Sequence, residues 1–311
     1  MKTSALYSLL LLALLFATGC NDDDDEVPTI NRNEPENVWG LQYAESPAGD
    51  FEAVYSSITS ALDAQDAITV VAEVDHGASA QALGTSLGNS RVVLFGNPAL
   101  GTPLMRINPA AGLDLPQKMH VYTAPDRDVI VTYNSTDYLA QRWGVGDASS
   151  INTISQALRN IALDASGGEP VATTVRAVNP NEGVIGRTTE LTVDSAYTRL
   201  INALNANDAI TIVGEVDHQA NAASVGQELR PSKLVIFGNP ALGTPLMRSE
   251  RSLGVDLPQK MLVFMDEDST TNIIYNDIVY LVRRHNADAT LSEVGQVAVA
   301  LDNLAAAAGG N

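Results

Sequence analysis

The stretch FGNPALGTPLMR runs from Phe95 to Arg106 and occurs again, letter for letter, from Phe237 to Arg248. The second copy follows the first by 142 residues (237 − 95). The same offset relates EVDH at 73–76 to EVDH at 215–218, and DLPQKM at 114–119 to DLPQKM at 256–261. The chain is therefore an internal duplication, and each copy tests what is inferred from the other.

Outside the two copies, the composition distinguishes an N-terminal region and a linker between the copies. We expect a signal peptide at 1–19, an acidic tether at 20–37, the first copy at 38–164, a linker rich in glycine and proline at 165–181, and the second copy at 182–308. With 45% apolar residues, each copy can bury a core.

The first residues predict a lipid anchor. Lys2 precedes an apolar run from Ala5 to Phe16, which is too short to span a bilayer, and small residues lead to Cys20. This pattern resembles the bacterial lipobox, in which the cysteine is lipidated; the alternative is an ordinary signal peptide with a stray cysteine. The acidic run from Asp22 to Glu26 resembles the surface-export signal of Bacteroidetes lipoproteins, and the alternative is a charged spacer. We expect a lipid-anchored protein of the cell envelope, at the outer membrane.

Charge and cysteine content exclude several functions. The net charge is −19, and so acidic a surface repels phosphate backbones, which argues against a nucleic-acid partner. Cys20 is the only cysteine, so the chain has no internal disulfide, and a lipidated thiol is not available for catalysis.

Periodicity predicts the order β-α-β-α-β-β-β-α in each copy, and hence an α+β fold with a mainly antiparallel sheet. We expect Asp194 to cap the first helix of the second copy, and Ser79 and Asn221 to cap a short helix in each copy. Asn239 followed by Pro240 predicts a helix start. Gly243 and Pro245 then predict a single turn and an irregular loop rather than a long helix.

These residues resemble a known family. FGNPALGTPLM followed by GLDLPQKM or GVDLPQKM, together with EVDH and a later Tyr-Asn pair, is similar to the signature of the domain of unknown function 302, once in each copy. The resemblance implies an α+β arrangement like that of the TATA-box-binding protein, with no established activity. It also implies pairing, so the two copies are expected to pair within one chain.

The EVDH segment offers a carboxylate beside an imidazole, in Asp75 and His76 and again in Asp217 and His218, and Glu73 and Glu215 share a strand face with the aspartates. Such a pair can serve in acid/base chemistry or bind metal. In the alternative interpretation, which we favour, the aspartate of EVDH caps backbone N–H groups and the histidine bonds a carbonyl. Glu73 points away from His76 on a regular strand.

The FGNPALG turn offers free backbone N–H groups after Asn97 and Asn239, which can hold an anion. Lys118 and Lys260, with Arg106 and Arg248, are candidates for its positive charge. The alternative is that the asparagine only caps a helical turn.

Metal binding has weaker support. Met105, Met119, His76 and His120 suit Cu(I) as ligands, but the second copy has Leu262 in place of His120, and methionine is commonly core filler. We expect no metal and no cofactor.

The leading hypothesis is therefore a non-enzymatic binding module for a small ligand or anion, with one pocket per copy near the FGNP turn. The candidate binding residues are Glu73, His76, Asn97, Lys118, Glu215, His218, Asn239 and Lys260. An acid/base enzyme, such as a hydrolase, that uses the histidines and lysines is the first alternative. A structural or copper-binding protein is the second. If the pocket hypothesis holds, His218, Asn239 and Lys260 should meet at one cavity.

Overall fold

A computed structural model describes residues 35, 37–173 and 176–310, which fall within one compact unit. The expected signal peptide, Cys20 and all but two residues of the expected tether lie outside the described residues.

Both copies contain the expected strands and helices. The first copy consists of β1 (Leu41–Ser46), α1 (Phe51–Asp63), β2 (Thr69–Asp75), α2 (His76–Ala82), β3 (Ser90–Gly96), α3 (Pro98–Ile107), the 3₁₀ helix η1 (Pro109–Asp114), β4 (Gln117–Thr123), β5 (Val129–Asn134), α4 (Thr136–Trp143) and α5 (Ile151–Ser166). A two-residue strand, β6 (Val171–Ala172), follows in the expected linker. The second copy consists of β7 (Val184–Thr189), α6 (Val193–Asn205), β8 (Thr211–Asp217), α7 (His218–Ser224), β9 (Ser232–Gly238), α8 (Pro240–Ser249), η2 (Arg251–Val255), β10 (Gln259–Met265), β11 (Thr271–Asn276), α9 (Ile278–Arg284) and α10 (Ser292–Gly309).

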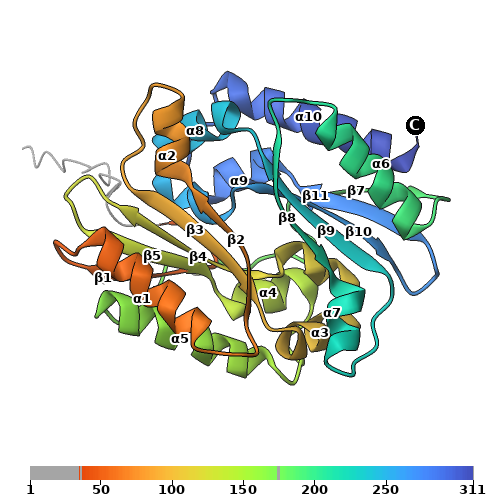
Figure 1. The fold of residues 1–311 in the computed structure, drawn as a ribbon, viewed down its shortest axis with the longest axis horizontal. Helices are drawn as coiled ribbons and strands as arrows, with labels where there is room; N and C mark the ends of the chain where they lie inside the picture. Colours follow the sequence, from red (N-terminus) through yellow and green to blue (C-terminus); the bar gives the residue numbers. More distant parts are fainter. Residues whose placement is uncertain (1–34, 36, 174–175, 311) are drawn as a thin grey trace, which may run out of the picture. The chain divides into compact units, whose positions relative to one another are not determined.

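Each copy forms its own antiparallel sheet. The strand orders are β2-β3-β4-β5-β1-β6 and β7-β11-β10-β9-β8, and every pairing is antiparallel (Figure 1). Helices α1 and α5 pack on the first sheet, and α6 and α10 pack on the second. The predicted α+β class, with two repeated domains, is confirmed.

Three of the predicted helix caps were wrong by a few residues. Helix α6 is capped by Thr192, whose hydroxyl accepts from the backbone N–H of Ser195, rather than by Asp194. Helices α2 and α7 are capped by Asp75 and Asp217, rather than by Ser79 and Asn221. An aspartate at the end of a strand is as strong a cap as serine or asparagine, so each helix begins one turn earlier, at the histidine.

The FGNPALGTPLMR segment was also predicted wrongly as a loop. Asn97 caps as expected, but α3 then continues for ten residues through Pro103. A proline inside a helix leaves the carbonyl four residues earlier without its usual donor. In α3 that carbonyl belongs to Ala99, and the side-chain amide of Gln227, from the second copy, donates to it at 3.2 Å. A tertiary hydrogen bond therefore replaces the one that the proline removes.

The two sheets meet through their edge strands, β2 and β8, which contact each other near the middle of the view in Figure 1. Each edge strand carries a bulge at the same position, Val71 in β2 and Val213 in β8. A β carbon on Gly214 would lie 3.2 Å from the side chain of Val71. The strand β8 therefore carries no side chain where β2 comes close to it.

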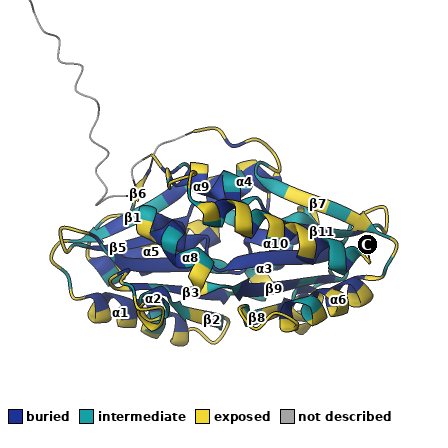
Figure 2. Cartoon of the chain, turned by 90° about the horizontal axis from the view of Figure 1, so that it is seen from above, coloured by how far each residue is buried: buried dark blue, intermediate teal, exposed yellow. Residues whose placement is uncertain are grey.

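The copies also exchange their 3₁₀ helices. Helix η1 of the first copy packs on β9, β10 and β11, whereas η2 of the second copy packs on β3, β4 and β5. Each sheet is thus covered by its own long helices and by a segment of the other copy. Figure 2 shows the strands buried between layers whose outer helix faces are exposed. Each copy has its own apolar cluster, with a few residues added from the other copy.

Candidate functional site

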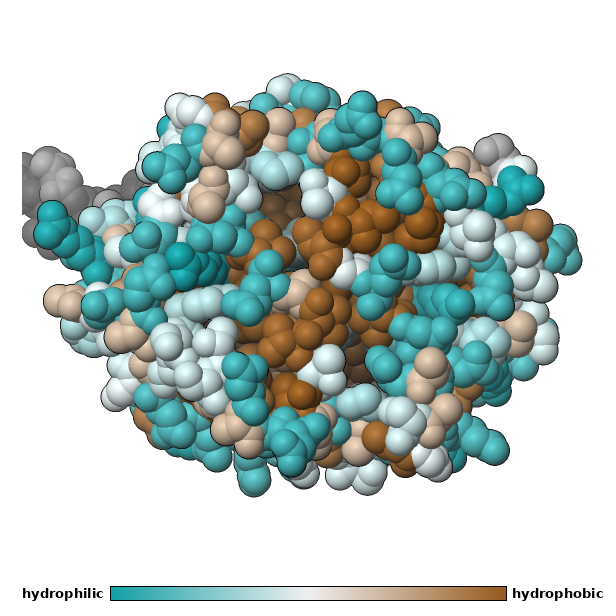
Figure 3. Space-filling view, in the orientation of Figure 1, coloured by the Kyte–Doolittle hydropathy of each residue, from teal (hydrophilic) through white to brown (hydrophobic). Residues whose placement is uncertain are grey.

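Two cavities lie beside the crossing of β2 and β8, one at the start of each FGNPALG helix. The first pocket, at α3, has a volume of about 430 Å³, and the second pocket, at α8, has a volume of about 240 Å³. Figure 3 shows apolar residues gathered around hollows in the middle of this face.

The two pockets are one site present twice. Apart from Thr153 in the first pocket and Leu246 in the second, every lining residue has its counterpart in the other lining. The offset is 142 residues, except along α5 and α10, where it is 143. The bulged residues Val71 and Val213 are among them. Bulges commonly occur beside functional sites, because they re-aim side chains.

Each pocket is built by both copies. The first takes its turn from Asn97 and its helical wall from α5, but also His218 and Asn221 from the second copy. The second pairs Asn239 and α10 with His76 and Ser79 from the first copy. The expectation that His218 and Asn239 share a cavity was therefore wrong, because each histidine crosses to the other copy.

No charged side chain lines either pocket. Asn97 and Asn239 use their side-chain oxygens to cap their helices, each at 3.0 Å from a backbone N–H. Lys118 and Lys260, expected to supply charge here, are not among the lining residues. The reason is the period of two along β4: Gln117 faces the pocket, so Lys118 faces the opposite side of the sheet.

The pocket histidines are buried and neutral. Burial is the largest cause that lowers the pKa of both His76 and His218 to about 4, against a partial rise from nearby backbone carbonyls, those of Gly254 and Leu257 for His76 and that of Gly112 for His218. Nε2 of each ring makes no hydrogen bond of normal geometry. Both imidazoles are therefore uncharged hydrogen-bonding groups at neutral pH, and each is a weak base.

A second group of residues lies between the copies, on the far side of the sheets from the pockets. We call Asp114, Lys118, Arg142, Asp256, Lys260 and Arg284 the buried ionic cluster; all six are at most 4% exposed. Lys118 Nζ lies 2.9 Å from Asp256 Oδ1 in the other copy, and Lys260 Nζ lies 3.6 Å from Asp114 Oδ1. Each arginine pairs with the aspartate of its own copy, Arg142 with Asp114 at 2.8 Å and Arg284 with Asp256 at 2.5 Å.

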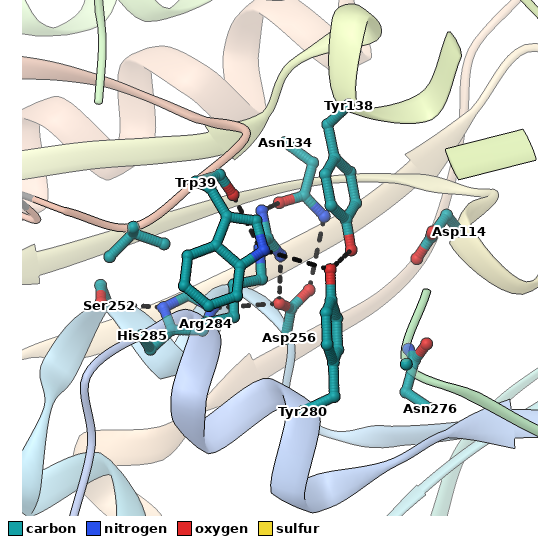
Figure 4. Close-up of polar contacts among 12 residues, drawn as sticks. Trp39, Asp114, Asn134, Tyr138, Ser252, Asp256, Asn276, Tyr280, Arg284 and His285 are labelled. Atoms are coloured by element: carbon teal, nitrogen blue, oxygen red, sulfur yellow. Dashed lines mark hydrogen bonds and ion pairs between the residues drawn. The ribbon is translucent and has the colours of Figure 1, made fainter. Parts of the chain in front are cut away.

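Neutral partners complete this cluster (Figure 4). Arg142 donates to Asn276 and Arg284 donates to Asn134, each across the copies. The hydroxyls of Tyr138 and Tyr280 face each other at 3.1 Å. His285 lies 3.0 Å from Asp256; because a carboxylate only accepts, Nε2 carries the proton and Nδ1 accepts from Ser252.

Burial and the neighbouring charges shift the pKa values of two residues in the cluster, Asp114 and Lys260. Burial alone would raise the pKa of Asp114, but Arg142, Lys260 and Lys118 lower it to about 2. Burial, and then repulsion by Lys118, lower the pKa of Lys260 to about 7.

The sequence profile described as Domain of unknown function DUF302 matches residues 43–162 and 185–308. The chain belongs to this family. The DUF302 chain is also 39% identical over 77 residues to fluoride-specific ion channels FluC 1 of Brucella suis biovar 1 and FluC 1 of Brucella abortus biovar 1. That segment is 25% of this chain, and it covers 30% and 28% of the two channels, so this chain spans less than a third of their length.

A crystal structure of an uncharacterized conserved protein DUF302 from Bacillus stearothermophilus is similar at 16% identity. The match covers 41% of this DUF302 chain and 98% of the other, with a TM-score of 0.37. Over the described part of the chain, no helix is long and apolar enough to cross a membrane.

The remaining candidates lie apart from the pockets. Glu73 and Glu215 accept hydrogen bonds from Tyr55 at 2.8 Å and from Tyr197 at 2.9 Å, on exposed positions of β2 and β8. Among the described residues, no group of three or more histidine, cysteine or acidic side chains is arranged to hold a metal ion.

Sequence reasoning missed several residues of this DUF302 chain that the geometry brings together. In the pockets they are Gln117 and Gln259, whose buried amide nitrogens have no hydrogen-bond partner, and the two bulged valines. In the cluster they are the aspartates, the arginines, and the Asn and Tyr pairs. The available signal was the 142-residue offset, which relates every one of these pairs.

Proposed function

We propose that this protein is a non-enzymatic binding module that takes two molecules of a small, uncharged, mainly apolar ligand, one in each pocket. The observation that carries the proposal is the duplication of one uncharged cavity lining in both copies. The first pocket, of about 430 Å³, falls within the usual range of small-molecule sites, and the second, of about 240 Å³, lies just below it, which favours a small ligand.

The polar groups of the pockets support a neutral ligand over an anion. The lining offers the imidazole of His218 or His76 and the amide of Gln117 or Gln259, all without charge at neutral pH. An anion buried among such groups would lose its hydration without gaining a cation. A carbonyl, hydroxyl or amide on an apolar body can use the unpaired amide of Gln117 or Gln259.

The acid/base enzyme has less support. Its histidines line the pockets, whereas its lysines face the aspartates of the buried ionic cluster. A base whose conjugate acid has a pKa of about 4 is also poorly matched to proton abstraction at neutral pH.

Blocking each pocket with a large side chain tests the proposal. Ala157 on α5 and Ala300 on α10 are equivalent lining residues, so Ala157→Trp should fill the first pocket and Ala300→Trp the second. We expect the unaltered protein to bind two equivalents of the neutral dye N-phenyl-1-naphthylamine, each single variant one equivalent, and the double variant none. Fluorescence titration with a parallel melting curve measures this.

Ala53→Trp on the exposed face of α1 is the matched control and should keep both sites. Two equivalents bound by the double variant, at an unchanged melting temperature, would rule out the pockets as the binding sites.

We further propose that Cys20 carries a lipid that anchors the protein in the cell envelope. The support is the apolar run, the small residues and the cysteine at the start of the chain. Cys20→Ala should release the protein from the membrane fraction and abolish incorporation of radiolabelled palmitate. Retention of label in that variant would sink this part of the proposal.

A further inference from the structure

The buried ionic cluster contains more positive than negative charge. Four cationic side chains face two carboxylates, and all six are at most 4% exposed. The nearest titratable neighbour, His285, adds no charge at neutral pH, because burial lowers its pKa to about 4. When Lys260 is protonated, the cluster therefore has an excess of two positive charges, in a protein whose overall charge is −19.

Three of the four cations have at least one hydrogen-bond acceptor. Arg142 donates to Asp114, to Asn276 and to the backbone carbonyls of Glu182 and Gly183. Arg284 donates to Asp256, to Asn134 and to the backbone carbonyl of Trp39. Lys118 donates to Asp256 at 2.9 Å.

Lys260 is the exception. Its Nζ is buried and makes no hydrogen bond, and the nearest carboxylate oxygen, on Asp114, is 3.6 Å away. Its counterpart in the first copy, Lys118, closes the equivalent contact to hydrogen-bonding distance. An ammonium group has three N–H donors, and burying it without partners is strongly unfavourable.

We propose that the buried ionic cluster is a binding site for one halide-sized anion, held against Nζ of Lys260. A single negative charge there would supply the missing acceptor for Lys260 and would offset half of the excess positive charge. We propose a small ion because all six side chains of the cluster are buried and its lysines line neither of the two pockets. Burial and repulsion from Lys118 lower the pKa of Lys260 to about 7. Both effects disfavour the charged ammonium group, and a bound anion would oppose both.

This site is separate from the ligand pockets, so the two proposals can fail independently. The β4 and β10 strands place Gln117 and Gln259 in the pockets, and Lys118 and Lys260 in the cluster, on opposite faces of each sheet.

The experiment compares sodium fluoride, chloride and bromide with sodium gluconate at equal ionic strength and pH, using the full chain. Gluconate is too large for the site and reports general salt screening. We expect each halide that fits to raise the melting temperature by several degrees beyond gluconate, with saturation at millimolar concentration. Lys260→Met should remove this increment, whereas Arg230→Met, at an exposed position, should keep it.

A crystal of the unaltered protein soaked in bromide gives a second measurement that does not depend on the folding of a variant. An anomalous peak beside Lys260 Nζ is the expected result. Equal melting curves in halide and gluconate, or a halide increment that survives in Lys260→Met, would overturn the proposal. So would bromide peaks confined to the surface.

Discussion

Replacing Asp256 by asparagine is expected to lower the free energy of unfolding by about 3–5 kcal/mol, the range found when one partner of a buried ion pair is removed. Asp256 receives contacts from Lys118 in the other copy and from Arg284 and His285 in its own. Asparagine has the same shape but carries no charge, so Lys118 and Arg284 would remain buried without a counter-ion. The loss should therefore be electrostatic, with little change in packing.

Denaturant unfolding at pH 7, read by circular dichroism, measures this change. Asp114→Asn, the counterpart in the first copy, should lose a comparable amount, because Asp114 faces Arg142 and Lys260. Asp63→Asn, at an exposed position of α1, should change the free energy of unfolding by less than about 0.5 kcal/mol. If Asp256→Asn behaved like Asp63→Asn, the ion pairs of the buried ionic cluster would not stabilise the fold.

The sequence was sufficient for the fold class, and the reason lies in local patterns. Strands β9 and β10 each contain a run of apolar residues that turn residues follow, and the hairpin between β10 and β11 is an acidic turn. The predicted helix boundaries were wrong where two residues of good capping type lie close together, as Asp75 and Ser79 do. The loop predicted for FGNPALGTPLMR was wrong because both helices continue through their proline, Pro103 in α3 and Pro245 in α8; in α3, Gln227 of the other copy donates to the carbonyl that the proline leaves without its usual donor.

The site was harder to predict, because its pairing depends on which copy supplies each residue. The repeat shows that His76 and His218 are equivalent. It does not show whether each histidine lies beside the FGNP turn of its own copy or beside that of the other copy. The structure places His218 with Asn97 and His76 with Asn239. No local pattern distinguishes this exchange from its absence, since both arrangements have the same period and the same caps.

The separation of the lysines from the pockets is the opposite of what we expected, although the strand period offered the signal for it. Gln117 and Lys118 are neighbours on one strand, so their side chains point to opposite faces. One face of β4 therefore belongs to a pocket and the other to the ionic cluster. The duplicated DLPQKM segment serves both sites at once: its aspartate and lysine contribute to the cluster and its glutamine to a pocket.

Mild acid is expected to destabilise this protein strongly, because its histidines are buried as neutral rings. The pKa values of His76, His218 and His285 are lowered to about 4, with burial as the largest cause, and that of His120 is well below the usual 6.5. In the unfolded chain these rings take up protons near pH 6.5. The stability that they contribute is therefore fully present above pH 6.5 and is lost as the pH falls towards 4. Each ring should contribute a slope of about 1.4 kcal/mol per pH unit across that window, which amounts to roughly 3 kcal/mol for one ring.

Urea unfolding at pH 7, 6 and 5 measures this slope, and the chain itself offers the control substitution. Leu262 occupies in the second copy the position that His120 occupies in the first, so leucine is compatible with this site in the fold. His120→Leu should reduce the slope by the contribution of one proton, although it removes the contact with Ser90. An unchanged slope in this variant would mean that His120 does not titrate on unfolding. A flat profile between pH 7 and 5 in the unaltered protein would show that the histidines are not held neutral by burial, and would remove the argument that the pockets are uncharged.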